Sequence, residues 1–133
     1  MSGNRNQRAL LMEIMIAVLF FGLCATVLLQ TFAAAREYSR RAGAEGEALI
    51  AAQDMSERLY AAEAPEEMLA ADGYVFEDGA WKKSGAEYAL EVVCEIEPLP
   101  AGEMLRAEVR AIFDGEALFE IPCARYTAKE AAE

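Results

Sequence analysis

Side chains that commonly carry acid–base or metal chemistry are few and scattered in this sequence. The 133 residues include no histidine, and the three cysteines are far apart: Cys24, Cys94 and Cys123. This composition excludes the usual zinc sites, histidine general bases and cysteine–histidine nucleophiles. The acidic runs Glu66-Glu67 and Glu91–Glu97 lack the spacing of a calcium loop, so we interpret them as solvated faces. We therefore expect no enzymatic activity, with no catalytic residue, cofactor, metal or small-molecule substrate.

One acid stands apart because it begins a long apolar run. Glu13 is followed by 22 residues without a charge, from Ile14 to Ala35. At about 1.5 Å per residue, a helix of this length covers roughly 33 Å, which is enough to cross a bilayer core of about 30 Å. Ala33-Ala34-Ala35 resembles a signal-peptidase site, but the run exceeds the roughly 7–15 apolar residues of a secretory signal. A retained membrane anchor is therefore favoured over a cleaved signal.

Charge is distributed unevenly on either side of this run. The chain carries a net charge of −11, to which residues 1–35 contribute +1 and the residues after Ala35 contribute −12. An acidic soluble part argues against nucleic acid and against a domain lying flat on anionic lipid. The positive-inside rule does not fix the orientation, because arginines flank the run on both sides: Arg5 and Arg8 before it, and Arg36, Arg40 and Arg41 after it.

Helical periodicity continues beyond the apolar run. An apolar stripe recurs at helical spacing through Tyr38, Ala42, Leu49, Ala52, Met55, Leu59 and Ala62. We expect a helix to begin near Ala9 and to end at Pro65, which lacks the N–H that a helix interior needs. Pro65 to Gly73 then predicts a short second helix, with proline in its first turn and glycine at its stop.

The period changes to two from Tyr74 onward, which predicts strands. Asp78-Gly79 is typical of a two-residue hairpin turn and would place Phe76 opposite Trp81. With Tyr74 these aromatic side chains would either pack in the core or form a small surface platform for a partner. Further strands follow from Glu87 to Glu97, from Leu105 to Phe113, and after Asp114-Gly115.

The register of the last two strands follows from their apolar faces. A three-residue loop that includes Glu116 would pair Ala107 with Cys123 and would set Arg110 opposite Glu120, whereas a two-residue loop would mix core with solvent. In sequence order, Ala107 then separates Cys94 from Cys123. Two strand spacings of about 4.8 Å are too long for a disulfide, so we expect two reduced cysteines.

These elements predict an α+β fold. A long N-terminal helix, with a transmembrane half and an amphipathic half, covers a C-terminal antiparallel meander of four or five strands. The expected ranges are a short basic leader or cytoplasmic tail at 1–8, the transmembrane half at 9–35, the amphipathic half at 36–64, the sheet domain at 65–126 and a frayed tail at 127–133.

This plan resembles type IV pilins and the pseudopilins of type II secretion. The run from Ala9 to Gly22, with Glu13 inside it, is similar to the family's Gly-Phe-Thr-Leu-Ile-Glu start after a short basic leader. The resemblance implies cleavage between Arg8 and Ala9, and a Glu13 carboxylate that neutralises the N-terminal amine of a neighbouring subunit. Here Arg8 occupies the position of the family's glycine, and Ala9 that of its usual phenylalanine.

The sequence allows two interpretations of the role of Glu13. In the first it takes part in assembly, with Arg8 as a substitute counter-charge if Ala9 does not become an N-terminus. In the second it is an acid at the start of a helix, favoured by the helix dipole at the level of the lipid headgroups.

The resemblance implies a structural subunit of a pilus, competence or type II secretion assembly. Such a subunit would act by packing against other pilin-like subunits through its N-terminal helix. It would cross the cytoplasmic membrane once, with its N-terminus inside and its sheet domain outside the cytoplasm. The alternative is an unprocessed, single-pass, signal-anchored protein whose sheet domain binds a partner.

Overall fold

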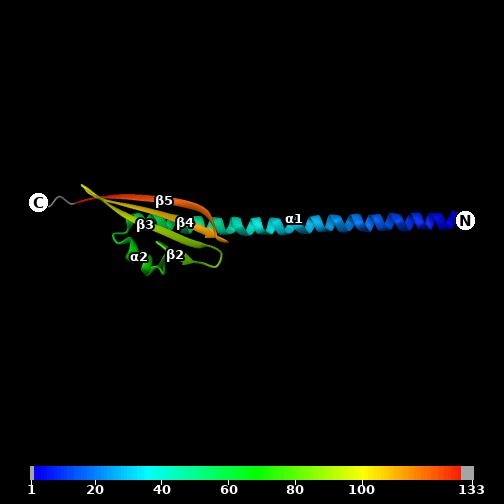
Figure 1. Cartoon of the computed structure of the whole chain (residues 1–133), viewed down its shortest axis with the longest axis horizontal. Coiled ribbons are helices and arrows are strands. Elements are labelled where there is room, and N and C mark those ends of the chain that lie inside the picture. Colours follow the sequence, from blue (N-terminus) through cyan, green and yellow to red (C-terminus); the bar gives the residue numbers. More distant parts are fainter. Residues whose placement is uncertain (1, 130–133) are drawn as a thin grey trace. The chain divides into compact units, whose positions relative to one another are not determined.

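The computed structural model describes residues 2–129 and has the expected α+β fold (Figure 1). Two helices precede five strands: α1 (Ser2–Ala61), α2 (Pro65–Ala71), β1 (Val75–Glu77), β2 (Ala80–Ser84), β3 (Ala89–Leu99), β4 (Gly102–Phe113) and β5 (Glu116–Ala128). The chain divides into two compact units, Met1–Arg40 and Arg41–Glu133. Each unit is described separately below.

The helix of the first unit begins earlier than its sequence predicts. It starts at Ser2 rather than near Ala9, so the described part of the expected leader is helical. Residues 2–8 contain no proline, and their arginine and glutamine side chains are good helix formers. Polar composition alone therefore does not mark a helix boundary here.

In the second unit, α1 ends at Ala61, three residues before the predicted end. Arg125 of β5 reaches this end, where its Nη1 donates to the carbonyl oxygens of Tyr60 and Ala62, each at 2.6 Å. The last carbonyls of a helix have no partner within the helix, so the guanidinium supplies donors that the helix lacks.

The short helix α2 begins at Pro65 and ends as its sequence predicts. Gly73 follows the helix with a φ of 87°, a left-handed conformation that glycine adopts without strain. The backbone N–H of Gly73 donates to Ala70, and that of Tyr74 donates to Leu69. This pair of bonds is the Schellman arrangement, and it turns the chain from α2 into β1.

All five strands form one antiparallel sheet in sequence order, β1-β2-β3-β4-β5. The turn at Asp78-Gly79 pairs Phe76 with Trp81, as predicted, and both turn residues have positive φ. The aromatic residues divide between the two expected arrangements. Tyr74 is buried in the core, whereas Phe76 is exposed and lies against Trp81 with ring centroids 5.3 Å apart.

The register of β4 and β5 is confirmed, but the predicted loop is wrong. Arg110 pairs with Glu120 and Ala107 with Cys123, as expected. The loop itself contains only Asp114 and Gly115, and Phe113 pairs directly with Glu116. A bulge between Ala111 and Ile112 then shifts the register by one residue. Next to the turn the strands therefore have the register of a two-residue loop, and beyond the bulge they have the register that a three-residue loop would give. The extra residue inside β5 has the same effect on the later pairs as a longer loop.

The buried stripe of α1 also differs from the predicted one. Tyr38 is 76% exposed and Leu49 is 41% exposed, although both were expected to cover the sheet. The predicted positions Ala52, Met55 and Leu59 are buried, and Ala44 and Ala48 take the places of the exposed ones. Small side chains let the helix approach the sheet closely, so alanines are favoured at the contact.

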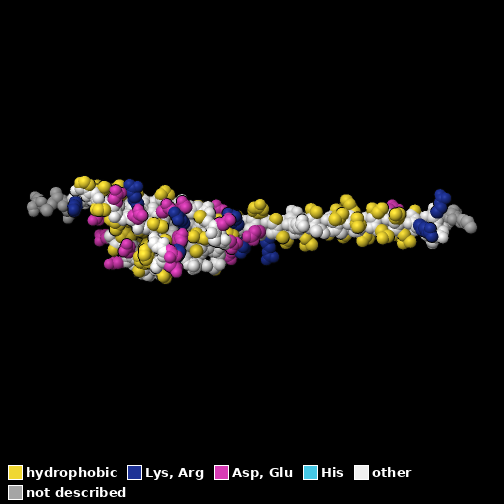
Figure 2. All heavy atoms as spheres, viewed as in Figure 1, with side chains coloured by type: hydrophobic (Ala, Val, Ile, Leu, Met, Phe, Trp, Pro, Cys, Tyr) yellow, Lys and Arg dark blue, Asp and Glu magenta, His cyan; other side chains and the backbone are white. Residues whose placement is uncertain are grey.

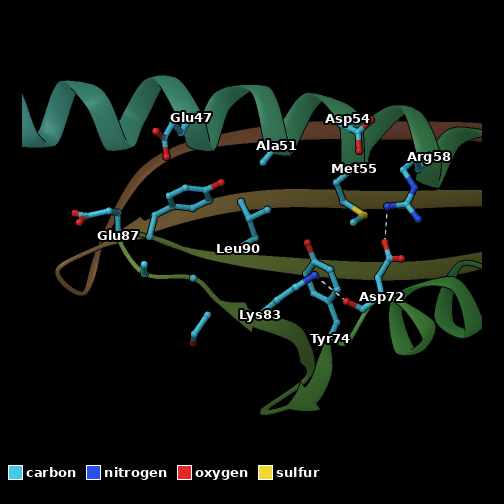
Figure 3. A pocket seen from close by; sticks show the side chains of 14 residues that line it. Glu47, Ala51, Asp54, Met55, Arg58, Asp72, Tyr74, Lys83, Glu87 and Leu90 are labelled. Carbon is cyan, nitrogen blue, oxygen red and sulfur yellow. Dashed lines mark hydrogen bonds and ion pairs between the residues drawn. The ribbon is translucent and has the colours of Figure 1, made fainter.

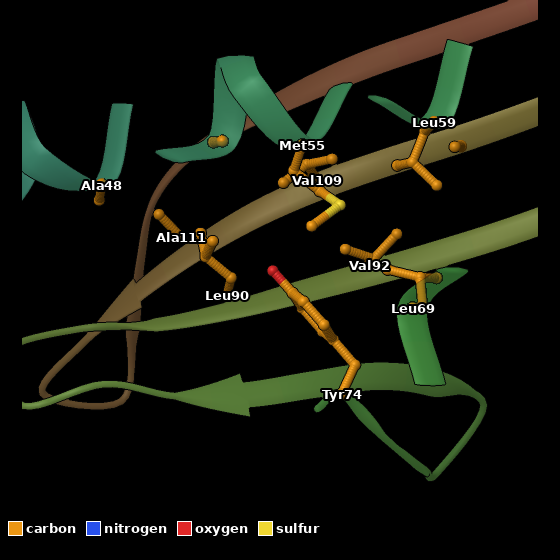
Figure 4. Close-up of a cluster of buried hydrophobic side chains, with 11 residues drawn as sticks. Ala48, Met55, Leu59, Leu69, Tyr74, Leu90, Val92, Val109 and Ala111 are labelled. Carbon is orange, nitrogen blue, oxygen red and sulfur yellow. The ribbon is translucent and has the colours of Figure 1, made fainter. Parts of the chain in front are cut away.

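One face of the sheet carries the core (Figure 4). Val92 of β3 and Val109 of β4 are fully buried, and Leu69 of α2 packs in the same cluster. Strand β5 continues to Ala128, so Thr127 and Ala128 belong to the sheet rather than to a frayed tail. Lys129 follows the strand and its backbone N–H donates to the Ala101 carbonyl at 2.9 Å, whereas residues 130–133 of the predicted tail lie outside the described residues.

Candidate functional site

The main candidate is the apolar part of α1, from Ile14 to Ala35. Its large side chains are exposed, from Ile14 at 52% to Phe21 at 76%. Figure 2 shows hydrophobic side chains along the whole visible face of this part of the helix. Among residues 2–129 it lies in the one helix that is long and apolar enough to cross a membrane, as judged by length and composition. So large an exposed apolar surface requires an apolar partner.

The hydroxyl groups of this segment are satisfied within the helix. Thr26 Oγ1 donates to the carbonyl of Gly22 at 2.9 Å, and Thr31 Oγ1 donates to that of Val27 at 2.8 Å. In hydrocarbon no water is present to bond such groups, so internal partners are needed there. These bonds make both threonines compatible with a lipid environment.

The predicted assembly residues Arg8, Ala9 and Glu13 lie together within this helix, and all three are exposed. Ala9 and Glu13 are four residues apart and therefore share one face. Arg8 and Glu13 are five residues apart, and no ion pair joins them in the described chain. The bond between Arg8 and Ala9 is helical, whereas proteases prefer exposed loops and termini.

The early start of α1 weakens the helix-dipole reading of Glu13. The first turn of α1 contains no acidic residue, and Glu13 lies 11 positions after Ser2. The dipole acts within the first turn, so it does not favour an acid at Glu13 in the intact chain. If the chain began at Ala9, Glu13 would lie at the end of the first turn. The helix dipole therefore does not account for this acid in the intact chain.

Acidic side chains of the sheet lie mainly on its solvent face, next to arginines. Arg110 contacts Glu108 at 2.6 Å and Glu120 at 3.1 Å, and Arg106 contacts Glu97 at 3.6 Å. Such exposed pairs contribute little to stability, because water and salt screen them. Among the described residues, no group of three or more acidic or cysteine side chains is suited to hold a metal ion.

The cysteines are free thiols, as predicted for Cys94 and Cys123. Both pair with Ala107, from opposite sides in the sheet. Burial raises the pKa of the Cys94 thiol to about 11, so at neutral pH it is protonated and a poor nucleophile. Cys24 is exposed on the apolar part of α1.

The second unit also contains a hollow of about 430 Å³ that sequence reasoning missed (Figure 3). Its walls come from α1, the end of α2, β2, the β2–β3 loop and β3. The sequence suggests an i,i+4 pair between Asp54 and Arg58, but Arg58 contacts Asp72 instead. Because these segments are far apart in the chain, no local spacing could have revealed the hollow.

Comparisons of the chain with family models, curated proteins and solved structures returned no match.

Proposed function

We propose that this chain is a membrane-anchored structural subunit of the pilin or pseudopilin type, which acts by helix packing and without catalysis. One observation carries the proposal. The same helix, α1, presents large exposed apolar side chains over residues 14–35 and a buried stripe over residues 44–59 that consists of three alanines, Met55 and Leu59. The first part suits lipid or other helices, and the second part covers a sheet.

The position of Glu13 supports assembly over simple anchoring. A carboxylate at the edge of an apolar span is costly unless a cation or a hydrogen-bond donor accompanies it. The described chain provides no ion pair for this carboxylate. A neighbouring subunit that contributes its N-terminal amine, or its Arg8, would supply the missing charge. The proposed partners are therefore further pilin-like subunits in the cytoplasmic membrane, with the sheet domain outside the cytoplasm.

Mass spectrometry of the N-terminus tests this proposal. The full chain is expressed in a bacterium that makes pilin-like assemblies, extracted from its membranes, and the N-terminal peptide is identified. The proposal predicts a mature chain that begins at Ala9. A chain that still begins at Met1 or Ser2 would count strongly against a filament subunit.

Substitution of Glu13 tests the role of the acid itself. Glu13→Ala should lower recovery of the chain in a cross-linked or sheared assembled fraction, while its amount in the membrane stays the same. Glu37→Ala is the matched control, because Glu37 is an exposed acid of the same helix outside the apolar run. Equal recovery of the two variants would show that Glu13 does not contribute to assembly.

Arg8 favours a second candidate function, that of an unprocessed single-pass protein whose sheet domain binds a partner. A long charged side chain stands where the resembled family has glycine, and the adjacent peptide bond is helical. Arg8→Gly separates the two functions. If cleavage at Ala9 appears only in the Arg8→Gly variant, the natural chain is a permanent anchor rather than a processed subunit.

A further inference from the structure

The hollow of the second unit combines an apolar floor with charged walls. The floor is formed by Ala51 and Met55 of α1 and by Leu90 of β3. Figure 3 shows Glu47 and Asp54 projecting from α1 and Glu87 from the β2–β3 loop. Gly85 in this loop lies so close to the chain that a Cβ would be 2.9 Å from the Tyr88 carbonyl oxygen. The loop wall therefore has a compact, defined path.

The charges of the hollow are unbalanced in favour of the acids. Its two cations are both engaged with Asp72: Arg58 contacts the carboxylate, and Lys83 donates to the backbone carbonyl at 2.8 Å (Figure 3). Three further carboxylates line the hollow, and none has an ion pair in the part of the chain that the structure describes: Glu47, Asp54 and Glu87. The hollow thus has net negative charge on more than one wall.

The hydroxyl of Tyr74 is a second and independent sign of a ligand. Tyr74 is only 5% exposed, and Figures 3 and 4 show its ring pointing from the α2–β1 connection toward Met55 and Leu90. Its hydroxyl makes no hydrogen bond with residues 2–129, and its oxygen is reachable from the hollow, since the buried polar side-chain atom left without a partner among these residues is Arg125 Nε. Burial raises its pKa to about 12, so the group is neutral and is able both to accept and to donate. A guest in the hollow would complete this bond.

We propose that the hollow is a docking site for an arginine side chain of a partner polypeptide. The aliphatic stem would lie on Ala51, Met55 and Leu90, while the guanidinium would bond the free carboxylates and the Tyr74 hydroxyl. Arginine fits better than a compact cation because its five donors form a planar fork that meets several acceptors from different directions. The open hollow also leaves room for the residues that flank the arginine, which favours a polypeptide over a small amine.

The probe for this site is a labelled peptide with the sequence of residues 36–41, which contains three arginines. Its binding to the full chain in detergent micelles is measured by fluorescence anisotropy. We expect it to bind at least tenfold more tightly than the same peptide with citrulline in place of arginine. Tyr74→Phe should weaken binding about fivefold without changing the unfolding transition, because the ring and its packing remain.

A matched pair of double variants separates docking from general attraction to an acidic protein. Asp54→Asn with Glu87→Gln removes two carboxylates from the hollow, and Glu95→Gln with Glu103→Gln removes two elsewhere. The first pair should weaken binding more than tenfold, and the second less than twofold. Equal losses would overturn the proposal, as would equal displacement of the peptide by spermidine, which would identify a small-amine site. Neither result bears on the proposed anchor, because the hollow contains no residue of the apolar run.

Discussion

Two regions of α1 differ in the exposure of their apolar side chains and, on average, in their size. Between Ile14 and Ala35 most side chains are large, and the large ones lie on all sides of the helix and are exposed. Between Ala44 and Leu59 the side chains on one face are mostly alanine and are buried against the sheet. Alanine is therefore favoured where the helix first meets the sheet, whereas the exposed run has the length and composition to cross a membrane.

The largest expected effect comes from placing the same acid in each region. Val109→Asp should unfold the second unit, because Val109 is fully buried and an unpaired carboxylate there costs more than about 4 kcal/mol. Val27→Asp should leave the unfolding transition of the sheet unchanged and should reduce retention in carbonate-washed membranes, at a cost of about 2.5–3.5 kcal/mol. Circular dichroism and membrane fractionation measure the two effects. If both variants unfold the sheet, the two regions are not independent.

A smaller effect is expected from enlarging an alanine in each region. Ala52→Leu should destabilise the second unit by up to about 3 kcal/mol, because Ala52 has no exposed surface and the added carbons would force α1 away from the sheet. Ala34→Leu is the control, since Ala34 is exposed in the apolar segment. Urea unfolding measures both. A stable Ala52→Leu variant would contradict the close packing of α1.

Removal of Arg125, the β5 residue that contacts the end of α1, should lower the free energy of unfolding by less than Ala52→Leu does. Arg125→Leu removes both hydrogen bonds to the carbonyls of Tyr60 and Ala62, and we expect a loss of about 1–2 kcal/mol. Arg106→Leu is the control, because Arg106 is exposed on the solvent face of the sheet. Hydrogen exchange should show faster opening at the end of α1 in the first variant alone. Equal exchange in both variants would exclude a capping role.

The smallest effect concerns pH. The hydrogen bond from Arg58 lowers the pKa of Asp72 below its usual value. The stabilisation is therefore present above the pKa that Asp72 has in the unfolded chain, and it is lost as pH falls through the lower pKa of the folded state. Asp72→Asn should flatten the acid limb of the stability profile slightly, whereas Asp78→Asn, at an exposed turn, should not. Identical acid limbs for Asp72→Asn and the wild type would exclude the pair as a contributor.

The structure of the sheet could be predicted from the sequence more completely than that of the helix. Strict alternation and the Asp-Gly turns determine which residues pair, so Phe76 with Trp81 and Arg110 with Glu120 were predictable. The bulge in β5 was not, because a longer loop and an extra strand residue give the same downstream register. The C-terminal part of the buried stripe of α1, from Ala52 to Leu59, was predicted correctly. Its N-terminal part was misplaced because hydrophobicity favours Tyr38 and Leu49, whereas the buried positions there are Ala44 and Ala48.

The two candidate sites also differ in how far the sequence predicts them. Arg8, Ala9 and Glu13 could be identified because they adjoin one continuous apolar run. The hollow could not, since Asp54 of α1 and Glu87 of the β2–β3 loop come together only through the folding of the helix on the sheet.

Labelling of Cys24 tests most directly whether residues 14–35 lie in lipid. Gly43→Cys adds a second exposed thiol on the same helix, at a site with no other atom within 4 Å of the new Cβ. The full chain is placed in lipid nanodiscs and treated with a water-soluble maleimide, and the modified peptides are quantified by mass spectrometry. If residues 14–35 lie in lipid, we expect rapid labelling at position 43 and almost none at Cys24 until the chain is unfolded in detergent. Equal rates at both sites would contradict this placement in lipid.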